Sequence, residues 1–255
     1  MAEPGVVAVV AANSDRLAAS LVGRLRAREL AVVACEPHEL ADRKILLDAN
    51  RVEWQGAPVG AVVWRVPPGV PLSASFTAED RAFADSETGA AWLAALSVPS
   101  VWAVNRYSAA VWYGGREWPA WQAWLRRHGV PVSSLRLGAK ASREAHWRPF
   151  LSSDTRPAPE ESAAKAMGIA TATAYAASSV LVVAGEIMGS APPSRGARAA
   201  ADALTASGVV LARLSLDGDD RVLAVDTIPD FRRGDELLPV VDRLSEAIHE
   251  RLHPR

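Results

Sequence analysis

The first forty residues alternate apolar runs with one amphipathic segment, and this order limits the folds open to the chain. Val6–Ala11 is a short, fully apolar run typical of a buried strand, and LAVVACE at 30–36 is a second. Between them, Asn13, Ser14 and Asp15 offer N-cap side chains to RLAASLVGRLRARE, whose apolar residues recur at helical spacing. A strand–helix–strand order joins parallel strands by a right-handed crossover. We therefore expect an α/β fold that begins with a parallel pair.

The remainder of the chain continues this mixture. A hairpin is predicted in ILLDANRVEWQGAPV, with its turn near Gly56. Thr77, followed three residues later by Asp80, marks the start of a long helix that runs to about Leu96. The stretch SAAVWYGGREWPAWQAWLRRHG is mostly helical and closes at Gly129. Other predicted elements are strands in GAVVWRVPP, SVWAVNR and VPVSSLRLG, a loop over 151–165, a hairpin turning near Gly185, a helix in SRGARAAADALTASG, a hairpin with Asp217–Asp220 as its turn, and a C-terminal helix in GDELLPVVDRLSEAIHERL.

The composition is that of a globular protein built without disulfides. The chain is 49% apolar and 22% charged with a net charge of −1, so we expect no bulk attraction to nucleic acid or to an anionic membrane. Cys35 is the only cysteine, which excludes a disulfide framework and a thiolate zinc site and fits a cytoplasmic location. We expect no signal peptide, and no apolar run reaches the roughly 20 residues that span a bilayer. Homo-oligomer formation stays open.

Nine tryptophans are the unusual feature of the composition. Trp118, Trp121 and Trp124 follow one another at a spacing of three, so they share one helix face. An aromatic platform for a peptide or a planar ligand is one interpretation. A buried core or interdomain seam is the favoured one, because large aromatic side chains usually supply buried area.

Three stretches carry a resemblance to a known superfamily. The first combines VVWRVPPGVP, FTAEDRAFADSETGAAWLAAL and SVWAVNR, the second is AVWYGGREWPAWQAWLRRHGVPVSS, and the third is ARLSLDGDDRVLAVDTIPDF. In this order and spacing they resemble the ATP-grasp superfamily, most of all its ribosomal peptide maturases, the graspetide-type ligases. The positions of the first stretch that match the family motifs are Trp64, Arg65, Pro67, Glu87, Trp102, Asn105 and Arg106.

The resemblance implies an architecture and a partner. It predicts a small N-terminal pre-ATP-grasp-like α/β domain with parallel strands over residues 1–105, followed by a reduced ATP-grasp-like α+β domain over 106–255. It implies a peptide substrate or a partner enzyme, and it assigns peptide or partner contacts to Arg65, Arg106 and Trp112.

The positions that would hold nucleotide phosphates depart from the family. ATP-grasp enzymes place lysine ammonium groups on the triphosphate, whereas this chain has Arg116 at the first position and Arg148 at the second. Arginine binds phosphate through a larger, planar fork and is not equivalent to lysine. The family also has an arginine in the strand that corresponds to SSVLVVAGE, where Ser178 or Ser179 stands here, and the segment from Arg148 to Ser179 is short.

The expected metal ligands depart further. The resemblance implies an aspartate, a glutamate and an asparagine in the final hairpin, which would hold magnesium together with the phosphates. The corresponding residues are Ser215, Ala224 and Asp226, so Asp226 alone remains as a metal ligand unless the acids of the DGDD turn approach it.

Two functions follow, and a third is weaker. The chain is either a degenerate ATP-grasp protein that binds a peptide or partner without cofactor, or an active ATP-dependent carboxylate–amine ligase that uses ATP and magnesium through rearranged ligands, with Arg116, Arg148 and Asp226 in its site. The first is favoured, because loss of both carboxylates removes stabilisation of a transferring phosphoryl group. The third is an α/β protein with unrelated hydrolytic or transfer chemistry.

Overall fold

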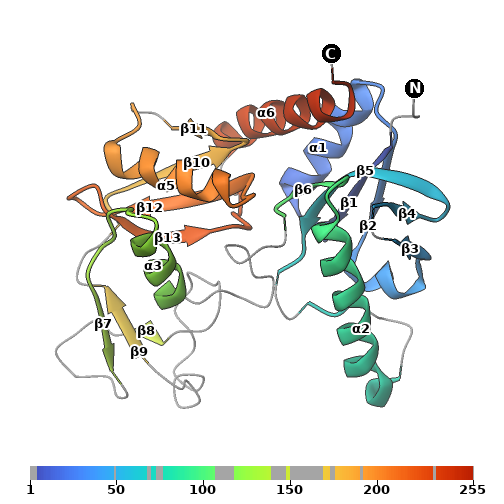
Figure 1. The fold of residues 1–255 in the computed structure, drawn as a ribbon, viewed down its shortest axis with the longest axis horizontal. Coiled ribbons are helices and arrows are strands. Elements are labelled where there is room, and N and C mark those ends of the chain that lie inside the picture. Colours follow the sequence, from blue (N-terminus) through green and yellow to red (C-terminus); the bar gives the residue numbers. More distant parts are fainter. Residues whose placement is uncertain are drawn as a thin grey trace.

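The structure, a computed structural model, is described here for residues 5–48, 50–67, 70–72, 77–106, 118–138, 148–149, 169–172, 176–189, 192–231 and 234–254. Figure 1 shows two sheets, each with its own helices, lying side by side. The C-terminal helix α6 (Gly234–Leu252) extends from one sheet to the other. None of the described helices is both long and apolar enough to cross a membrane.

The N-terminal sheet is built around a parallel core. Its order is β2-β1-β5-β4-β3, with β6 also paired to β5. The strands β2, β1, β5 and β6 are mutually parallel, which confirms the predicted crossover, whereas β3 and β4 form an antiparallel hairpin. The turn between β4 and β5 has positive φ at Gln55 and Gly56, as a tight hairpin turn requires. The strand bounds are β1 Val6–Ala11, β2 Val32–Cys35, β3 Ile45–Leu47, β4 Val52–Trp54, β5 Ala57–Arg65 and β6 Trp102–Val104.

Alternation along the strands gives this sheet two apolar faces. Ala8 and Val10 face α2 (Ala78–Ser97), and Trp92 of α2 packs edge-on against Trp54 at 4.9 Å between ring centroids. Val7 and Val9 face the opposite side, which α1 (Arg16–Ala27) and α6 cover together. Helices α1 and α2 begin at predicted caps, since Asp15 accepts from Ala18 N and Thr77 accepts from Asp80 N.

The second sheet is antiparallel throughout, in the order β11-β10-β12-β13. Its strands are β10 Ser178–Val183, β11 Glu186–Met188, β12 Leu211–Leu216 and β13 Val222–Asp226. The predicted hairpins that turn at Gly185 and at Asp217–Asp220 are therefore confirmed. One face packs on α5 (Arg195–Ala206), and the other includes Leu181 and Leu211, which pack with apolar residues of α6. A small third sheet has the order β7-β9-β8, with β7 Leu135–Gly138, β8 Arg148–Pro149 and β9 Ile169–Ala172.

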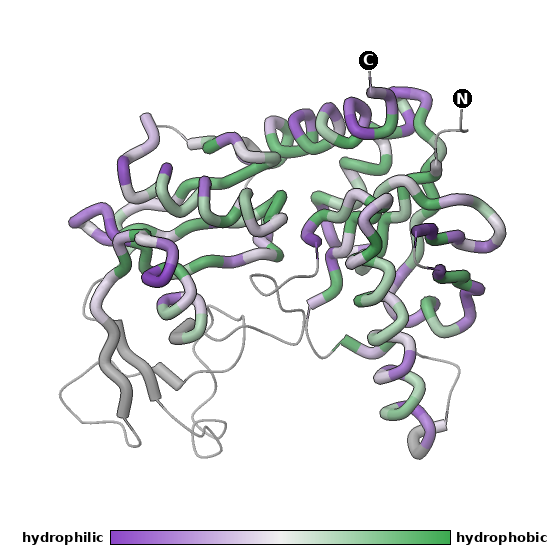
Figure 2. Tube along the Cα trace, viewed as in Figure 1, coloured by the Kyte–Doolittle hydropathy of each residue, from purple (hydrophilic) through white to green (hydrophobic). Residues whose placement is uncertain are grey.

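Helix α6 contributes to both halves of the molecule. Leu237, Val240, Leu244 and Ile248 are buried in a cluster that contains residues of both sheets. At its end, Leu252 lies where Gly60 of β5 leaves room for it. Figure 2 shows hydrophobic and hydrophilic residues alternating along α6, as a helix with one buried face requires. The mixed α/β architecture is confirmed, and the division at residue 105 stays a prediction.

Helix α3 (Trp118–Arg127) packs on β13, where Gln122 Nε2 donates to the carbonyls of Val222 and Leu223. Trp121 is 5% exposed, as expected for a core residue. Trp124 is half-buried and stacks on His128 with 4.0 Å between ring centroids. The side chain of Trp118 lies outside the described residues.

Candidate functional site

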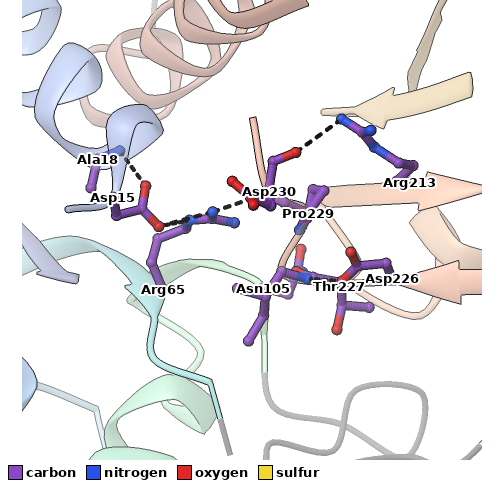
Figure 3. Close-up of polar contacts among 10 residues, drawn as sticks. Asp15, Ala18, Arg65, Asn105, Arg213, Asp226, Thr227, Pro229 and Asp230 are labelled. Atoms are coloured by element: carbon purple, nitrogen blue, oxygen red, sulfur yellow. Dashed lines mark hydrogen bonds and ion pairs between the residues drawn. The ribbon is translucent and has the colours of Figure 1, made fainter. Parts of the chain in front are cut away.

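The site lies where the carboxyl ends of the parallel strands meet the end of the last hairpin. Asp15 follows β1, Arg65 is the last residue of β5, and Asn105 follows β6. Because parallel strands end at the same edge, these three side chains come together, and this edge is where open α/β sheets bind ligands. They face the segment 226–230, which starts with the last residue of β13 (Figure 3).

Arg65 joins the two halves of the molecule. Its Nε and Nη2 lie 3.0 and 2.9 Å from Asp15 Oδ2, and Nη2 also donates to the carbonyl of Pro229 at 2.9 Å. The side chain is 4% exposed, and its Nη1 is buried without an acceptor among the residues that the structure describes. The structure therefore places Arg65 inside the molecule, and its assignment to peptide binding stays a prediction.

Asn105 makes the second connection. Its Nδ2 donates to the carbonyls of Leu211 (2.8 Å) and Thr227 (3.0 Å), and its Oδ1 accepts from the amides of Val210 and Leu211 at 2.7 Å each. The residue is 2% exposed. One amide side chain thus fixes the start of β12 and the segment after β13 relative to the first sheet.

Arg106 points the other way, toward the end of α2. Its Nη1 donates to the carbonyls of Ser97 and Val98 at 3.2 and 3.3 Å, and its Nη2 donates to that of Val101 at 2.7 Å. A cation at these carbonyls stabilises the C-terminal end of a helix. The contacts of Arg106 are therefore structural in kind, and the predicted peptide contact stays a prediction.

Asp226 lies in the segment that Arg65 and Asn105 hold. Its Oδ1 accepts from the amide of Ile228 at 2.9 Å. Burial raises the pKa of the Asp226 carboxyl, although the Ile228 amide and the guanidinium groups of Arg65 and Arg213 act in the opposite direction. Asp226 is the Cα partner of Arg213 across the hairpin.

Arg213 is held in place from several sides. Its Nη2 donates to Glu236 Oε2 at 2.8 Å and to the carbonyl of Asp230 at 3.3 Å, and its guanidinium lies 5.6 Å from the centroid of the Phe231 ring. Figure 3 shows Arg65 and Arg213 on either side of Asp230. Arg213 belongs to the third resembling stretch, but sequence analysis assigned it no role. The signal was its spacing of two from Ser215, which places both on one face of a strand.

The two remaining hairpin positions lie in one row of small side chains. Ser179 of β10, Ser215 of β12 and Ala224 of β13 are successive Cα partners across three strands. None of them carries a carboxylate, and Ser179 is exposed. Strand alternation puts Ala224 and Asp226 on the same face. The sheet position to which the family resemblance assigns a metal therefore has two hydroxyls and a methyl group in this row.

The acids of the DGDD turn are engaged at the opposite end of the hairpin. Asp217 Oδ1 accepts from the amides of Asp219 and Arg221 at 2.9 Å each, and Ser133 Oγ donates to Asp217 Oδ2. Asp220 Oδ2 accepts from the amide of Gly196 at the start of α5 at 2.8 Å. These two carboxylates order the turn and the helix end rather than a metal.

The described part of the site offers few ligands for magnesium. Magnesium is usually held by one or two carboxylates together with phosphates. Within the described ranges no three His, Cys, Asp or Glu side chains form a group that could hold a metal ion. Asp226 has the guanidinium groups of Arg65 and Arg213 near it, and the Asp230 carboxylate is the second acid close enough to affect its pKa. Its Cα partner across the hairpin is Arg213.

Three predicted site residues are placed only in part or not at all. Arg148 lies in β8, where it pairs with Ala170, but its side chain lies outside the described residues. Arg116 and Trp112 also lie outside them. Their assignments to phosphate and to peptide binding stay predictions.

Comparison with solved structures identifies the fold. The chain is similar to the ATP-grasp ligase PsnB complexed with precursor peptide PsnA2 and AMPPNP, at a TM-score of 0.72 and 15% identity, covering 99% of each chain. It is similar to the macrocyclase MdnC from Microcystis aeruginosa MRC bound with precursor peptide MdnA, at a TM-score of 0.66 and 9% identity, covering 96% of this chain and 99% of that one. The chain is also similar to a RiPP-associated ATP-grasp ligase from Chryseobacterium gregarium in complex with ADP and a leader and core peptide. The TM-score is 0.63 and the identity 8%, covering 98% of each chain.

These likenesses confirm that the chain has the fold of ATP-grasp peptide maturases. At such identities they show the fold alone. No protein-family model and no curated protein sequence matches the chain.

Proposed function

We propose that the chain is a degenerate ATP-grasp protein that binds a peptide or a partner enzyme in a peptide-modification pathway, without magnesium-dependent ligation. The observation that carries the proposal is the row Ser179, Ser215 and Ala224, which leaves Asp226 as the single carboxylate on its face of the hairpin. An ATP-grasp reaction stabilises a transferring phosphoryl group with metal and cations. A face with one carboxylate in place of the family's full ligand set supports loss of that chemistry.

Peptide binding is supported by the fold. The structures of PsnB, MdnC and the Chryseobacterium gregarium ligase contain precursor, leader or core peptides. We therefore propose a peptide or a peptide-bearing partner for this chain, acting in the cytoplasm, where its single buried Cys35 stays reduced.

Turnover tests the proposal. ATP hydrolysis should be measured with magnesium for the unaltered chain and for Asp226→Ala, with and without a synthetic candidate precursor peptide. We expect the unaltered chain and Asp226→Ala to hydrolyse ATP at the same background rate. The peptide should bind, and its mass should not change. Magnesium-dependent hydrolysis, or loss of one water from the peptide at ordinary enzyme rates, abolished by Asp226→Ala, would contradict the proposal.

An active ligase is the second candidate, and one observation favours it. The chain covers 99% of the PsnB structure with AMPPNP, so the fold is retained nearly end to end. In this candidate Arg116 and Arg148 bind phosphate and Asp226 binds magnesium.

Restoring the missing ligands separates the two candidates. Ser215→Asp combined with Ala224→Glu should raise magnesium-dependent ATP affinity in calorimetry if the chain is degenerate, because it supplies the absent carboxylates. In an already active ligase with rearranged ligands, the same pair should lower affinity or leave it unchanged. Ser178→Asp is the control, because Ser178 is exposed and pairs with Leu216, one position away from the row, so strand alternation puts its side chain on the other face.

A further inference from the structure

Two histidines lie one helical turn apart at the end of α6. The amide of His253 donates to the carbonyl of His249 at 2.9 Å, so the turn between them is formed. Their ring centroids lie 4.8 Å apart, with 45° between the ring planes. His249 is half-buried and His253 is exposed. The two imidazoles are therefore neighbours, and solvent reaches both.

The acids beside the pair are bound to another side chain. Glu246 and Glu250 each precede one of the histidines by three residues, so they lie on the same side of the helix. Arg243 Nη1 lies 3.3 Å from Glu246 Oε2 and 4.0 Å from Glu250 Oε2. In the part of the chain that the structure describes, no third His, Cys, Asp or Glu side chain completes a metal-holding group with the pair. The ligands that this end of α6 offers are thus the two imidazoles.

A pair of imidazoles at this spacing favours one class of ion. Imidazole nitrogen suits Cu²⁺, Ni²⁺ and Zn²⁺, whereas magnesium prefers oxygen ligands. Four residues is also the spacing at which the two histidines of an H-E-x-x-H helix bind zinc. Two ligands on one turn bind an ion more tightly than two separate histidines, because the second nitrogen is already near the ion when the first has bound.

The pair flanks the residue that seats α6 on the first sheet. A Cβ built on Gly60 of β5 would come within 2.4 Å of Leu252 Cδ2, so Leu252 uses the space that this glycine leaves. Ile248, one turn earlier, is fully buried. The carboxyl end of α6 lies beside the first sheet (Figure 1). An ion bound by residues 249 and 253 together would fix the turn that carries Leu252.

We propose that His249 and His253 bind one divalent transition-metal ion, Cu²⁺, Zn²⁺ or Ni²⁺, and that this ion holds the last turn of α6 against the first sheet. Water completes the coordination. Copper binds most tightly of the three, as expected for nitrogen ligands. The site lies on α6 and not at the carboxyl ends of the parallel strands, so the inference does not depend on the proposed function.

Copper binding tests the inference directly. Cu²⁺ should be titrated by calorimetry into the full chain at neutral pH, and the loaded chain should be studied by electron paramagnetic resonance. We expect one site whose spectrum shows two nitrogen ligands, and millimolar magnesium should not displace the ion. His249→Gln and His253→Gln should each weaken binding about tenfold or more, because a single imidazole remains.

Two controls separate the pair from the histidine content of the chain. His128→Gln removes an exposed histidine that follows α3 and stacks on Trp124, and it should leave copper affinity within about twofold. His253→Gln combined with Glu250→His keeps the number of histidines but puts two of them at adjacent positions. Adjacent residues do not share a helix face, so binding should stay as weak as in His253→Gln alone.

Amide exchange tests the effect on the helix. Zn²⁺ at about 100 times its dissociation constant should slow exchange at the amide of His253 by up to about 100-fold, because the ion binds only the formed turn. Exchange in α5 should not change.

Several outcomes would contradict the inference. It is overturned if the unaltered chain binds no copper, if the spectrum shows a single nitrogen ligand, or if His249→Gln and His253→Gln bind as the unaltered chain does. Equal affinity of the adjacent histidine pair would also overturn it. Metal binding without slower exchange at the amide of His253 would overturn the role of the ion in holding the last turn of α6.

Discussion

The edge of the first sheet and the face of the last hairpin meet at one site, yet they are built in opposite ways. At the edge, Arg65 and Asn105 are 5% and 2% exposed and bond across to the other half. On the hairpin face, Ser179, Ser215 and Ala224 are small side chains, and Ser179 is exposed.

This difference separates the residues that hold the two halves together from the positions where the family resemblance places metal ligands. Removing one member of a buried, paired network leaves uncompensated charges and donors, so substitutions at the edge are costly. Small side chains that are exposed, as Ser179 is, or half-buried, as Ser215 and Ala224 are, contribute little to stability, so we expect substitutions on the hairpin face to be tolerated. We therefore expect this fold to tolerate changes at the metal-ligand positions without unfolding.

The largest expected effect is at Arg65. Arg65→Met leaves the Asp15 carboxylate and the Pro229 carbonyl without their partner and should lower the free energy of unfolding by about 3–5 kcal/mol in urea denaturation. Arg24→Met is the control, because its pair with Asp242 is half-exposed, and it should cost less than about 1 kcal/mol. Equal effects of the two substitutions would show that the buried contacts of Arg65 contribute no more to stability than an exposed ion pair.

Asn105→Ala should have the second-largest effect on the free energy of unfolding. It leaves two amides and two carbonyls without their side-chain partner, at a cost of about 3 kcal/mol in the same measurement. The control is Asn50→Ala at an exposed asparagine, with an expected change within about 0.5 kcal/mol. A neutral Asn105→Ala would mean that the two halves are joined mainly by α6.

Arg106→Met should have an intermediate effect on the free energy of unfolding. It tests whether Arg106 contributes to stability as Arg65 and Asn105 do. Loss of two bonds to the end of α2 and one to Val101 before β6, in a half-buried position, should cost about 1–2 kcal/mol, with faster amide exchange confined to the end of α2 and the segment up to β6. If the variant keeps its stability and instead loses peptide affinity, Arg106 is a peptide contact, as the family resemblance implies.

The smallest effect belongs to the hairpin face. Ser179→Ala and Ser215→Ala should each change the free energy of unfolding by less than about 0.5 kcal/mol. A loss of more than about 1 kcal/mol at either serine, measured in the same urea series, would remove the contrast between the two regions.

The order of elements was predictable from sequence because local signals agree with the fold. Thr77 and Gly56 are examples, since a cap and a tight turn depend on residues close in the chain. The hairpin of β12 and β13 was also predicted, with its turn at the right residues.

The site was predictable only as a set of candidates. Asp226 was found from its place in a motif, but its neighbours were not, because Arg65 and Pro229 are brought together by tertiary packing across the two halves. The same holds for Arg106, whose partners Ser97 and Val98 at the end of α2 involve no sequence motif. Whether a charged side chain binds a ligand or a helix end depends on geometry that spacing does not encode.

Helix α6 also bears on how the protein is made. The first sheet is complete once β6 has been synthesised, but one of its faces is covered jointly by α1 and by α6. At the usual speed of translation, α6 leaves the ribosome about ten seconds after β6. During that interval Val7, Val9 and Val63 have only part of their cover, so the nascent chain presents an apolar surface that chaperones can recognise.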